Sequence, residues 1–345
     1  MNQENGVRFI APQQSTPTKD MDVFYNPVMK TNRDISVAII SMFKPKRIAD
    51  PLAGCGIRGI RMKLALPPAE VWINDRNPKA FALAQKNAKL NHADVHVTCA
   101  DASEFLKRGF DYVDIDPFGS PNPFLDSAVR AVRSKGILAL TATDTAPLSG
   151  TYPRACQRKY WATPCKNWMM HETGIRILIR KAQLIGAQYD KALIPIYCHA
   201  TEHYFRTYLQ CFRGKSKVDA VLALHEHIDF SKGIRTSSQG IGPLWTGKLF
   251  DPRVAQHVAK QCPMLMTETI AQEACIEAIG FYSTHQIAKG RKQALPPMEH
   301  ILTTLRKKNQ ASRTHFSYEG IRTTATRVQV QAAMRKPIPR RASPK

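Results

Sequence analysis

Apolar and polar positions follow a rhythm that predicts short strands alternating with amphipathic helices. Between residues 47 and 143, apolar runs such as RIAD, VWIND, YVDID and GILALTAT are typical of strands, and GIRGIRMKLAL and PKAFALAQKNAKL between them are typical of helices. Pro67 and Pro68 end the first of these helices, and Pro78 suits the first turn of the second. Strands that alternate with helices favour parallel pairing, so the pattern predicts an α/β fold with a doubly wound sheet.

Further elements are expected on both sides of this region. A helix is predicted over TNRDISVAIISMF, residues 31–43, with Thr31 or Asn32 near its cap. A second amphipathic helix is predicted at 172–187, followed by two strands that run to about Phe212.

The rhythm ends after Lys215, and the stretch 231–247 is rich in Gly and Ser. Such a change in composition indicates a boundary. We therefore expect an N-terminal extension plus the sheet domain at 1–222 and a second domain, with mixed α+β structure, at 223–345. The last residues, from about 334, are expected to be a disordered basic tail.

The second domain also contains one clear helical pattern. After Pro297, apolar residues recur with the spacing of a single helical face at Met298, Ile301, Leu302 and Leu305.

Charge gives the first indication of a partner. The chain of 345 residues has 50 Lys plus Arg against 27 Asp plus Glu, a net charge of +23. Solubility alone needs a net charge of only about 2–8 in a small domain, so a polyanionic partner such as nucleic acid explains the excess better. Fourteen of the basic residues lie between Gln286 and the C-terminus, against two glutamates, which suits an RNA backbone.

Membrane and metal sites are not indicated. There is no signal peptide pattern and no run of about 20 apolar residues, so we expect a protein of the cytoplasm. The eight cysteines include no C-x-x-C pair and are expected to be free thiols. His199 and His203 are four residues apart, but their surroundings read as strand, bend, strand, which argues against a shared metal.

A glycine motif follows the first predicted strand. Gly54, Gly56 and Gly59 match G-x-G-x-x-G between a strand and a helix, where glycines allow a tight turn and the close approach of a ligand. The motif alone fits a dinucleotide, S-adenosylmethionine or simple packing. Asp75, at the end of the next strand, can accept hydrogen bonds from ribose hydroxyls, or it can cap the helix that starts near Asn77.

The third strand is followed by CADASEF. Asp101 is placed to meet an adenine amine, with Ala102 leaving room for the ring. From the local sequence alone, Asp101 fits equally well as the cap of the helix ASEFLKR.

The most informative motif is DIDPFGSP, residues 114–121, at the end of the fourth strand. The lone pair of an exocyclic base amine is delocalised into the ring, so a carboxylate that polarises its N–H assists methylation. Asp116 is the candidate acceptor, Pro117 fixes the turn without an N–H of its own, and Phe118 can stack on the base, worth ~1–3 kcal/mol. An Asp–Pro turn also occurs in ordinary loops. Asp114, two residues earlier on the same face, competes with Asp116, which we prefer because it directly precedes the proline.

The chain resembles the tRNA (guanine-26-N2)-dimethyltransferase family over almost its whole length. The matching segments are FYNPVMKTNRD (24–34), AGCGIRGIR (53–61), INDRNPKAF (73–81), DIDPFGSPNPFLDSAVR (114–130), TATDTAPLSGTYPRACQRKY (141–160), HETGIRILIR (171–180), HYFRTYLQ (203–210), GPLWTGKL (242–249) and RTHFSYEGIRT (313–323). Several blocks keep both order and identity, so this resemblance is far more specific than the glycine motif.

The resemblance implies a class I, Rossmann-like S-adenosylmethionine methyltransferase domain followed by a family-specific RNA-binding domain. It implies transfer of one or two methyl groups to N2 of guanine 26 in tRNA, with S-adenosylhomocysteine as the other product. It also implies cofactor contacts at Arg33, Arg58, Asp75, Asp101 and Ala102, beside Gly54 and Gly56. Phe24 is implied as a second aromatic that sandwiches the guanine with Phe118.

In one respect the chain departs from its relatives. Many of them have paired cysteines, spaced for zinc, between the HYFR and GPLW segments, whereas residues 211–241 contain only Cys211, so no zinc is expected.

Two alternatives remain open: an amino-methyltransferase acting on another RNA or DNA base, and a non-catalytic RNA-binding protein. An NAD dehydrogenase fits the glycines but neither DPFG nor the charge. No protein partner is inferred.

Overall fold

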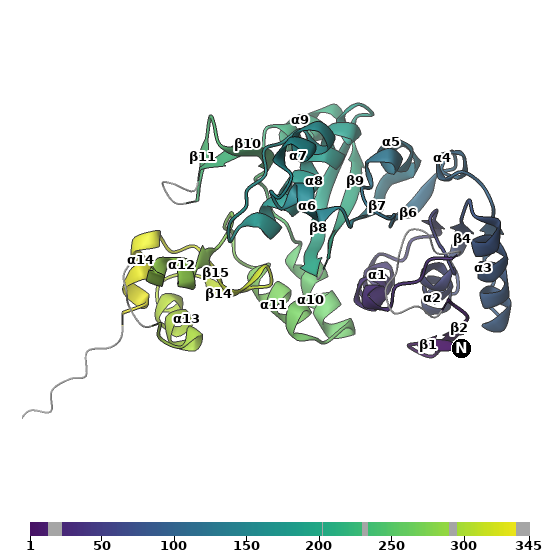
Figure 1. Ribbon diagram of the computed structural model, residues 1–345, viewed down its shortest axis with the longest axis horizontal. Coiled ribbons are helices and arrows are strands. Elements are labelled where there is room, and N and C mark those ends of the chain that lie inside the picture. Colours follow the sequence, from purple (N-terminus) through teal and green to yellow (C-terminus); the bar gives the residue numbers. More distant parts are fainter. Residues whose placement is uncertain (13–22, 202, 230–233, 290–294, 336–345) are drawn as a thin grey trace, which may run out of the picture.

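The computed structural model of the chain describes residues 1–12, 23–201, 203–229, 234–289 and 295–335. Its centre is a seven-stranded sheet with strand order β5-β4-β3-β6-β7-β9-β8 (Figure 1). Pairing is parallel from β5 to β7, and β9 is antiparallel to both of its neighbours. The seven strands are β3 (Arg47–Asp50), β4 (Glu70–Asn74), β5 (His96–Thr98), β6 (Phe110–Ile115), β7 (Val132–Ala142), β8 (Lys191–Thr201) and β9 (Tyr204–Arg213).

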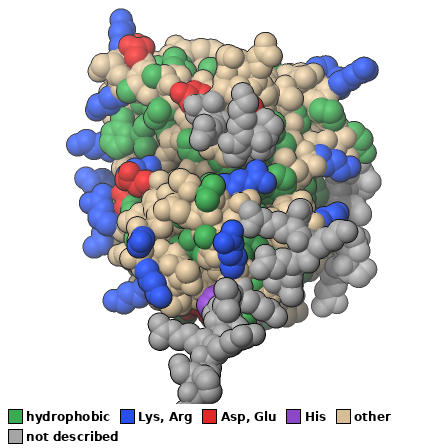
Figure 2. Space-filling model, turned by 90° about the vertical axis from the view of Figure 1, so that its left-hand side faces the viewer, with side chains coloured by type: hydrophobic (Ala, Val, Ile, Leu, Met, Phe, Trp, Pro, Cys, Tyr) green, Lys and Arg blue, Asp and Glu red, His purple; other side chains and the backbone are tan. Residues whose placement is uncertain are grey.

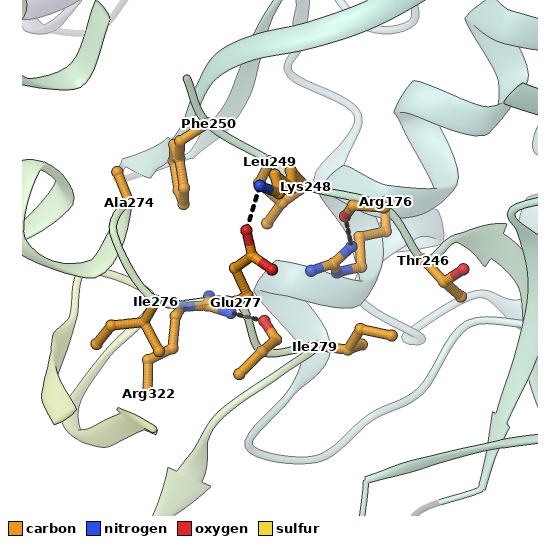
Figure 3. Close-up of a pocket in the computed structure, with 12 residues that line it drawn as sticks. Arg176, Thr246, Lys248, Leu249, Phe250, Ala274, Ile276, Glu277, Ile279 and Arg322 are labelled. Atoms are coloured by element: carbon orange, nitrogen blue, oxygen red, sulfur yellow. Dashed lines mark hydrogen bonds and ion pairs between the residues drawn. The ribbon is translucent and has the colours of Figure 1, made fainter. Parts of the chain in front are cut away.

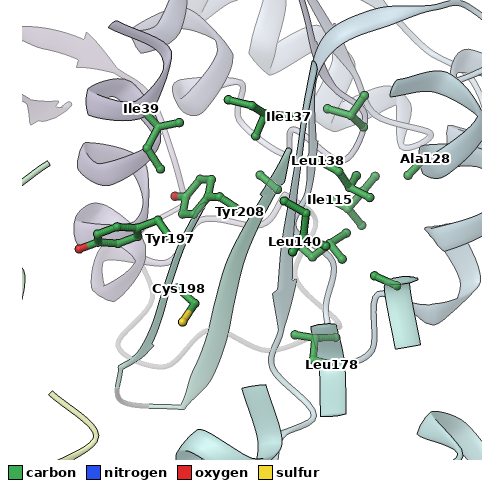
Figure 4. Close-up of a cluster of buried hydrophobic side chains, with 14 of the residues drawn as sticks. Ile39, Ile115, Ala128, Ile137, Leu138, Leu140, Leu178, Tyr197, Cys198 and Tyr208 are labelled. Carbon is green, nitrogen blue, oxygen red and sulfur yellow. The ribbon is translucent and has the colours of Figure 1, made fainter. Parts of the chain in front are cut away.

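Helices cover both faces of this sheet, which confirms the predicted α/β class. In Figure 4, Ile39 of α1 lies on one side of the strands, and Ala128 of α5 and Leu178 of α8 lie on the other, against Ile115 and Leu140. The helices of this part of the chain are α1 (Lys30–Phe43), α2 (Ile57–Ala65), α3 (Pro78–Leu90), α4 (Ala102–Phe105), α5 (Asn122–Ala131), α6 (Thr145–Leu148), α7 (Pro153–Tyr160), α8 (Met170–Ala187) and α9 (Lys215–Leu222).

The start of α1 differs from the sequence prediction. The helix begins at Lys30 and its N-cap is Met29, two residues before Thr31, because a short 3-10 helix, η1 (Pro27–Met29), leads directly into α1. The Asn26 side chain caps η1 by accepting a hydrogen bond of 2.9 Å from the Val28 N–H. Asn followed by Pro is itself a strong start signal. Before it, an N-terminal hairpin that the sequence did not reveal pairs β1 (Asn2–Glu4) with β2 (Val7–Phe9).

In the rest of the chain, the described residues form two small antiparallel sheets with helices beside them. The first sheet has the order β11-β10-β12, and the second has the order β13-β15-β14. Their elements are β10 (His225–Asp229), β11 (Arg235–Ser237), β12 (Ile241–Trp245), α10 (Pro252–Gln261), α11 (Leu265–Glu273), β13 (Tyr282–Ser283), α12 (Thr284–Lys289), α13 (Met298–Arg306), β14 (Ala311–Thr314), β15 (Ser317–Thr323) and α14 (Arg327–Ala333). The predicted helix after Pro297 is α13, whose Ile301, Leu302 and Leu305 are buried as expected.

Among the described residues, buried apolar side chains form two clusters. The larger one fills both faces of the central sheet and extends to Phe316, and the smaller one lies between Ile287 and Met334. The predicted division of the chain at residues 222 and 223 stays a prediction. Met334 is buried in the smaller cluster, and residues 336–345, where most of the predicted tail falls, lie outside the described residues.

A buried ion network joins the C-terminal elements to the central domain. Arg322 of β15 donates hydrogen bonds of 2.8 Å to Glu172 of α8 and to Glu273 of α11, and Arg176 of α8 donates one of 2.8 Å to Glu172. A hollow of about 250 Å³ lies at this junction between the two arginines (Figure 3). Both guanidinium groups have carboxylate and carbonyl partners, so this hollow presents no unpaired guanidinium to a ligand.

Candidate functional site

A second hollow, of about 270 Å³, lies at the carboxyl ends of the parallel strands. This is the edge where open α/β sheets bind ligands. It is lined by Phe24, Pro51, Leu52, Gly54, Asp75, Arg76, Asp101, Ala102, Asp116, Pro117, Phe118 and Phe124. Eight of these residues are candidates from the sequence, so the fold brings together side chains that are up to 94 positions apart in the chain, from residue 24 to residue 118.

The glycine loop is built for close packing. Gly54 has φ +55°, and a Cβ there would lie 2.6 Å from the carbonyl oxygen of Phe24. Gly56, which does not line the hollow, has φ +80°, and a Cβ there would lie 2.9 Å from Ala84 Cβ. Both positions therefore exclude larger residues on conformation and on space.

Asp75 and Asp101 each combine a structural contact with a place in the hollow. The Asp75 carboxylate accepts hydrogen bonds of 2.9 Å from the N–H groups of Gly54 and Asn77, so it fixes the glycine loop, while Asn77 itself caps α3. Asp101 caps α4 by accepting a hydrogen bond of 2.8 Å from the Ser103 N–H. The alternatives of capping and ligand contact at Asp101 are thus compatible, since one carboxylate can serve both.

The turn after β6 carries Asp116, Pro117 and Phe118. Pro117 is buried, whereas the Phe118 side chain is exposed at the hollow. Gly119 then takes φ +79° and is held by the loop after β7, because its N–H donates to Thr143 Oγ1 at 2.6 Å and its carbonyl accepts from the Thr143 N–H at 2.9 Å. The turn of Asp116, Pro117 and Phe118 is therefore held on its C-terminal side, at Gly119, by the loop after β7.

The Asp116 carboxylate accepts a hydrogen bond from Nη2 of Arg58. Nη1 of Arg58 donates to Asn32 Oδ1 at 2.8 Å and to Ser36 Oγ at 3.1 Å, and it lies 3.5 Å from Asp114 Oδ2. Arg58 is buried and does not line the hollow, but it touches a carboxylate that does.

Asp114 shares Arg58 with Asp116 but differs from it in burial and in access to the hollow. Its side chain is fully buried and does not line the hollow. It accepts hydrogen bonds of 3.0 and 2.6 Å from Arg206 and one of 2.8 Å from the Tyr112 hydroxyl. Burial would raise the pKa of Asp114, but Arg206 and Arg58 outweigh it and hold the pKa below its ordinary value. Asp114 is therefore an ionised partner of two arginines inside the sheet.

Asp50, the last residue of β3, is a third carboxylate in this region. Burial raises the pKa of Asp50 to about 7, with Arg58 opposing the rise and Asp114 and Asp116 adding to it. Its Oδ2 atom has no hydrogen-bond partner among the described residues. Asp50 is thus partly protonated at neutral pH.

Arg33 lies away from the hollow and pairs with the N-terminal hairpin. Its Nε donates to Glu4 Oε2 at 2.9 Å, and Nη2 donates to Glu4 Oε1 and to the Asn26 carbonyl. Glu4 also accepts a hydrogen bond of 2.8 Å from Arg61. A contact between Arg33 and a cofactor stays a prediction, and it requires the guanidinium to serve a second anion besides Glu4.

Phe24 and Phe118 face each other at the hollow. Their ring centroids are 4.1 Å apart and their planes are inclined by 65°. A base between two rings needs a centroid separation of roughly 7 Å, twice the ~3.5 Å of a carbon–carbon contact. The predicted sandwich therefore requires the rings to move apart.

Four lining residues were not identified from the sequence: Pro51, Leu52, Arg76 and Phe124. The first three lie one or two residues after strand ends, a position that in itself marks ligand-facing residues in such sheets. No sequence signal distinguishes Phe124 from a core residue of α5. The role of Glu4 as the partner of two arginines was also missed.

The described residues contain no group of three or more His, Cys, Asp or Glu side chains able to hold a metal ion. His199 is buried and its Nδ1 shares a hydrogen bond of 2.8 Å with Thr201 Oγ1. Among the same residues, none of the helices combines the length and apolar character needed to cross a membrane.

Known proteins resemble the chain over nearly its full length. Residues 6–335 match the family model described as N2,N2-dimethylguanosine tRNA methyltransferase. A tRNA (guanine(26)-N(2))-dimethyltransferase from Methanocaldococcus jannaschii is 39% identical, over 94% of this chain and 95% of its own length. A tRNA (guanine(26)-N(2)/guanine(27)-N(2))-dimethyltransferase from Aquifex aeolicus is 36% identical, over 96% and 95%. The solved structure of Trm1 from Pyrococcus horikoshii with S-adenosyl-L-methionine is 34% identical, with a TM-score of 0.85 over 93% of this chain and 96% of that one.

Proposed function

Because the chain belongs to the N2,N2-dimethylguanosine tRNA methyltransferase family, we propose that it methylates the exocyclic N2 of guanine 26 in tRNA, with S-adenosylmethionine as methyl donor. The support comes from relatives that carry this activity in their names and from a similar structure that contains the donor. The observation that carries the proposal is the single hollow in which Asp75 and Asp101 meet Asp116, Pro117 and Phe118.

The donor fits one side of this hollow. Gly54 lines the hollow without a side chain, Asp75 presents a carboxylate suited to ribose hydroxyls, and Asp101 and Ala102 form the end suited to adenine. When bound, S-adenosylmethionine supplies an electrophilic methyl group on a sulfonium. The residues of this chain orient it and exclude water, and positioning of two substrates is the larger part of such catalysis.

Arg58 and Arg33 are proposed to serve the methionine carboxylate of the donor. A guanidinium has five N–H donors, so an arginine that already holds one carboxylate can bind another. Arg58 is the stronger candidate, since it contacts Asp116 directly, whereas Arg33 is held by Glu4.

The acceptor side is formed by the turn after β6. Asp116, 15% exposed at its side chain, is proposed to accept a hydrogen bond from the guanine amine and to stabilise the charge that develops on N2. Pro117 presents no N–H that would repel the amine. Phe118 and Phe24 are proposed to stack on the base once their rings have parted.

The polyanionic substrate agrees with the charge of the chain. Figure 2 looks onto the end of the molecule that carries α13 and α14, and Lys and Arg side chains are more frequent on it than acidic ones. The C-terminal module is therefore proposed to contribute to tRNA binding, and the cytoplasm is the proposed location. No protein partner is proposed.

The test is transfer of labelled methyl groups to an unmodified tRNA transcript by the wild-type protein and by Asp116→Asn. Loss of a hydrogen-bonding base costs about 10²–10⁴ in rate. We expect a loss of that size in Asp116→Asn, with the affinity for S-adenosylmethionine within a few-fold of wild type. Loss of donor affinity in proportion to activity would contradict the role of Asp116. A wild-type protein that binds tRNA and donor without transfer would favour the non-catalytic alternative, and transfer to another base would favour a different substrate.

A further inference from the structure

Helix α7 is a feature of the fold that the proposed chemistry does not use. It lies in the block TATDTAPLSGTYPRACQRKY, yet none of its residues lines the hollow. Its inner face is buried through Cys156 and Tyr160, which are four residues apart, and its sequence PRACQRKY contains no acidic residue.

The C-terminal end of α7 is hydrogen-bonded to the segment that directly follows Phe118, at Ser120 and Asn122. The Tyr160 hydroxyl donates to Asp144 Oδ1 at 2.6 Å and shares a hydrogen bond of 2.8 Å with Ser120 Oγ. Asn122 Nδ2 donates to the Lys159 carbonyl at 2.9 Å. Because Ser120 is two residues beyond Phe118, their Cα atoms are at most roughly 7 Å apart. The helix therefore borders the mouth of the hollow on the acceptor side.

The outer face of α7 carries exposed cations. Arg154 and Arg158 are exposed and, being four residues apart, share one side of the helix. Neither has a hydrogen bond or an ion pair with any other described residue, whereas the neighbouring Lys159 pairs with Asp144 at 3.6 Å. Two unneutralised arginines beside a site are well suited to phosphates.

Aromatic side chains stand at both ends of this basic face. Tyr152, at the start of the helix, is 61% exposed, and Trp161, just after it, is 46% exposed. The Trp161 ring already contacts the Lys181 ammonium. Tyr152 has no ring or cation contact among the described residues. Exposed aromatics interleaved with cations are typical of surfaces that hold unpaired nucleotides.

We propose that the outer face of α7 binds the tRNA strand next to the target guanine, with Arg154 and Arg158 on backbone phosphates and Tyr152 stacked on an unpaired neighbouring base. This inference rests on the proposed function, because it assigns a surface to the same substrate. Through Tyr160 and Ser120, the strand bound on α7 and the turn that carries Asp116 are held in one fixed arrangement.

The experiment compares the wild-type protein with Arg154→Gln/Arg158→Gln in tRNA binding at several salt concentrations. Each phosphate contact contributes roughly 0.7–0.9 to the slope of log K against log salt, so the slope should fall by roughly 1.4–1.8. At 0.15 M salt the same arithmetic gives a roughly 14- to 30-fold weaker affinity. KM for tRNA should rise accordingly, while donor affinity and kcat at saturating tRNA stay at wild-type values.

The matched control is Lys86→Gln/Lys89→Gln, which removes the same charge from exposed positions near the end of α3. It should leave affinity and salt slope within twofold of wild type. An unchanged affinity in the arginine variant, or an equal loss in the control, would overturn the assignment to α7.

A second pair of variants tests the stacking residue. Tyr152→Ala should weaken tRNA binding roughly 5- to 150-fold, the range for one base–aromatic stack, and Tyr152→Phe should not. Equal affinities for all three proteins would refute stacking. If instead the wild-type protein binds tRNA through α7 but transfers no methyl group, the proposed function fails and the binding surface stands.

Discussion

Replacement of Asp114 and Asp116 by asparagine should have opposite consequences, although the two residues are only two positions apart. Asp114 is fully buried and holds Arg206, which is itself fully buried, through hydrogen bonds of 2.6 and 3.0 Å. Asp114→Asn leaves that guanidinium inside the sheet without its anion. Breaking one partner of a buried pair costs about 3–5 kcal/mol.

This cost can be converted into a melting temperature. An unfolding entropy of ~2.1 cal/mol/K per residue gives about 0.7 kcal/mol/K for the 345 residues, so Tm should fall by about 4–7 °C if the chain unfolds as one unit. Asp116→Asn removes a partly exposed ion pair, and Arg58 keeps Asn32 and Ser36 as partners. Because Arg58 also keeps Asp114 nearby, no buried cation is left without an anion, and the Tm should fall by less than that of Asp114→Asn.

Calorimetry and methyl-transfer rates on the same two samples separate the roles. We expect Asp114→Asn to be unstable and, well below its Tm, to retain substantial activity, and Asp116→Asn to be stable and inactive. An Asp114→Asn protein with the Tm of wild type and no activity would refute the reasoning, because Asp114 would then act in catalysis and not in folding.

Three further outcomes follow from the geometry. Gly54→Ala should lower donor affinity at least tenfold in equilibrium binding. The new Cβ would lie 2.6 Å from the Phe24 carbonyl oxygen, and φ at this position is +55°. Unchanged affinity would mean that the glycine loop does not shape the donor site. His315 and Arg322 lower the pKa of Glu273 to about 2 against the opposing effect of burial, so its contribution to stability is complete above about pH 4.5 and is lost as the pH falls toward 2; the wild-type Tm should drop over that interval by more than the Tm of Glu273→Gln. Asp50 has a raised pKa, so the folded state binds a proton more tightly than the unfolded state, and the stability of the wild type falls as pH rises from about 4 to 7. Asp50→Asn lacks this titration, so the difference in Tm between variant and wild type should shift in favour of the variant from pH 5 to pH 8. A difference that does not change with pH would contradict this.

Much of the fold was predictable because its signals are local. The strands from β3 to β7 and helix α3 were found from apolar runs, and Pro78 marks the first residue of α3 as expected. The same holds for α13, whose apolar residues recur at the spacing of one helical face. The sheet of β10 to β12 was missed, because its short strands lack a regular alternation and include a bulge between Glu226 and Ile228.

The hollow was predictable in its outline and not in its contacts. The residues after successive strand ends meet there because parallel strands share one edge, and this needs no knowledge of side-chain packing. The partners of the arginines come from distant parts of the chain. Glu4 pairs with Arg33 from an N-terminal hairpin, and Arg206 pairs with Asp114 from a strand 92 residues away. The local pattern of apolar and polar residues therefore predicts neither ion pair.

The central claim is most directly tested by the nucleoside products formed on two transcripts, an unmodified tRNA and the same tRNA with adenine in place of guanine 26. The account predicts N2-methylated guanosine from the first transcript with the wild-type protein, none from Asp116→Asn, and little from the second transcript; the ratio of mono- to dimethylguanosine and any product from guanine 27 follow from the same chromatogram. Equal N2-methylguanosine from both transcripts would contradict guanine 26 as the target, and a methylated adenosine or cytidine would contradict the claim that this site acts on the guanine amine.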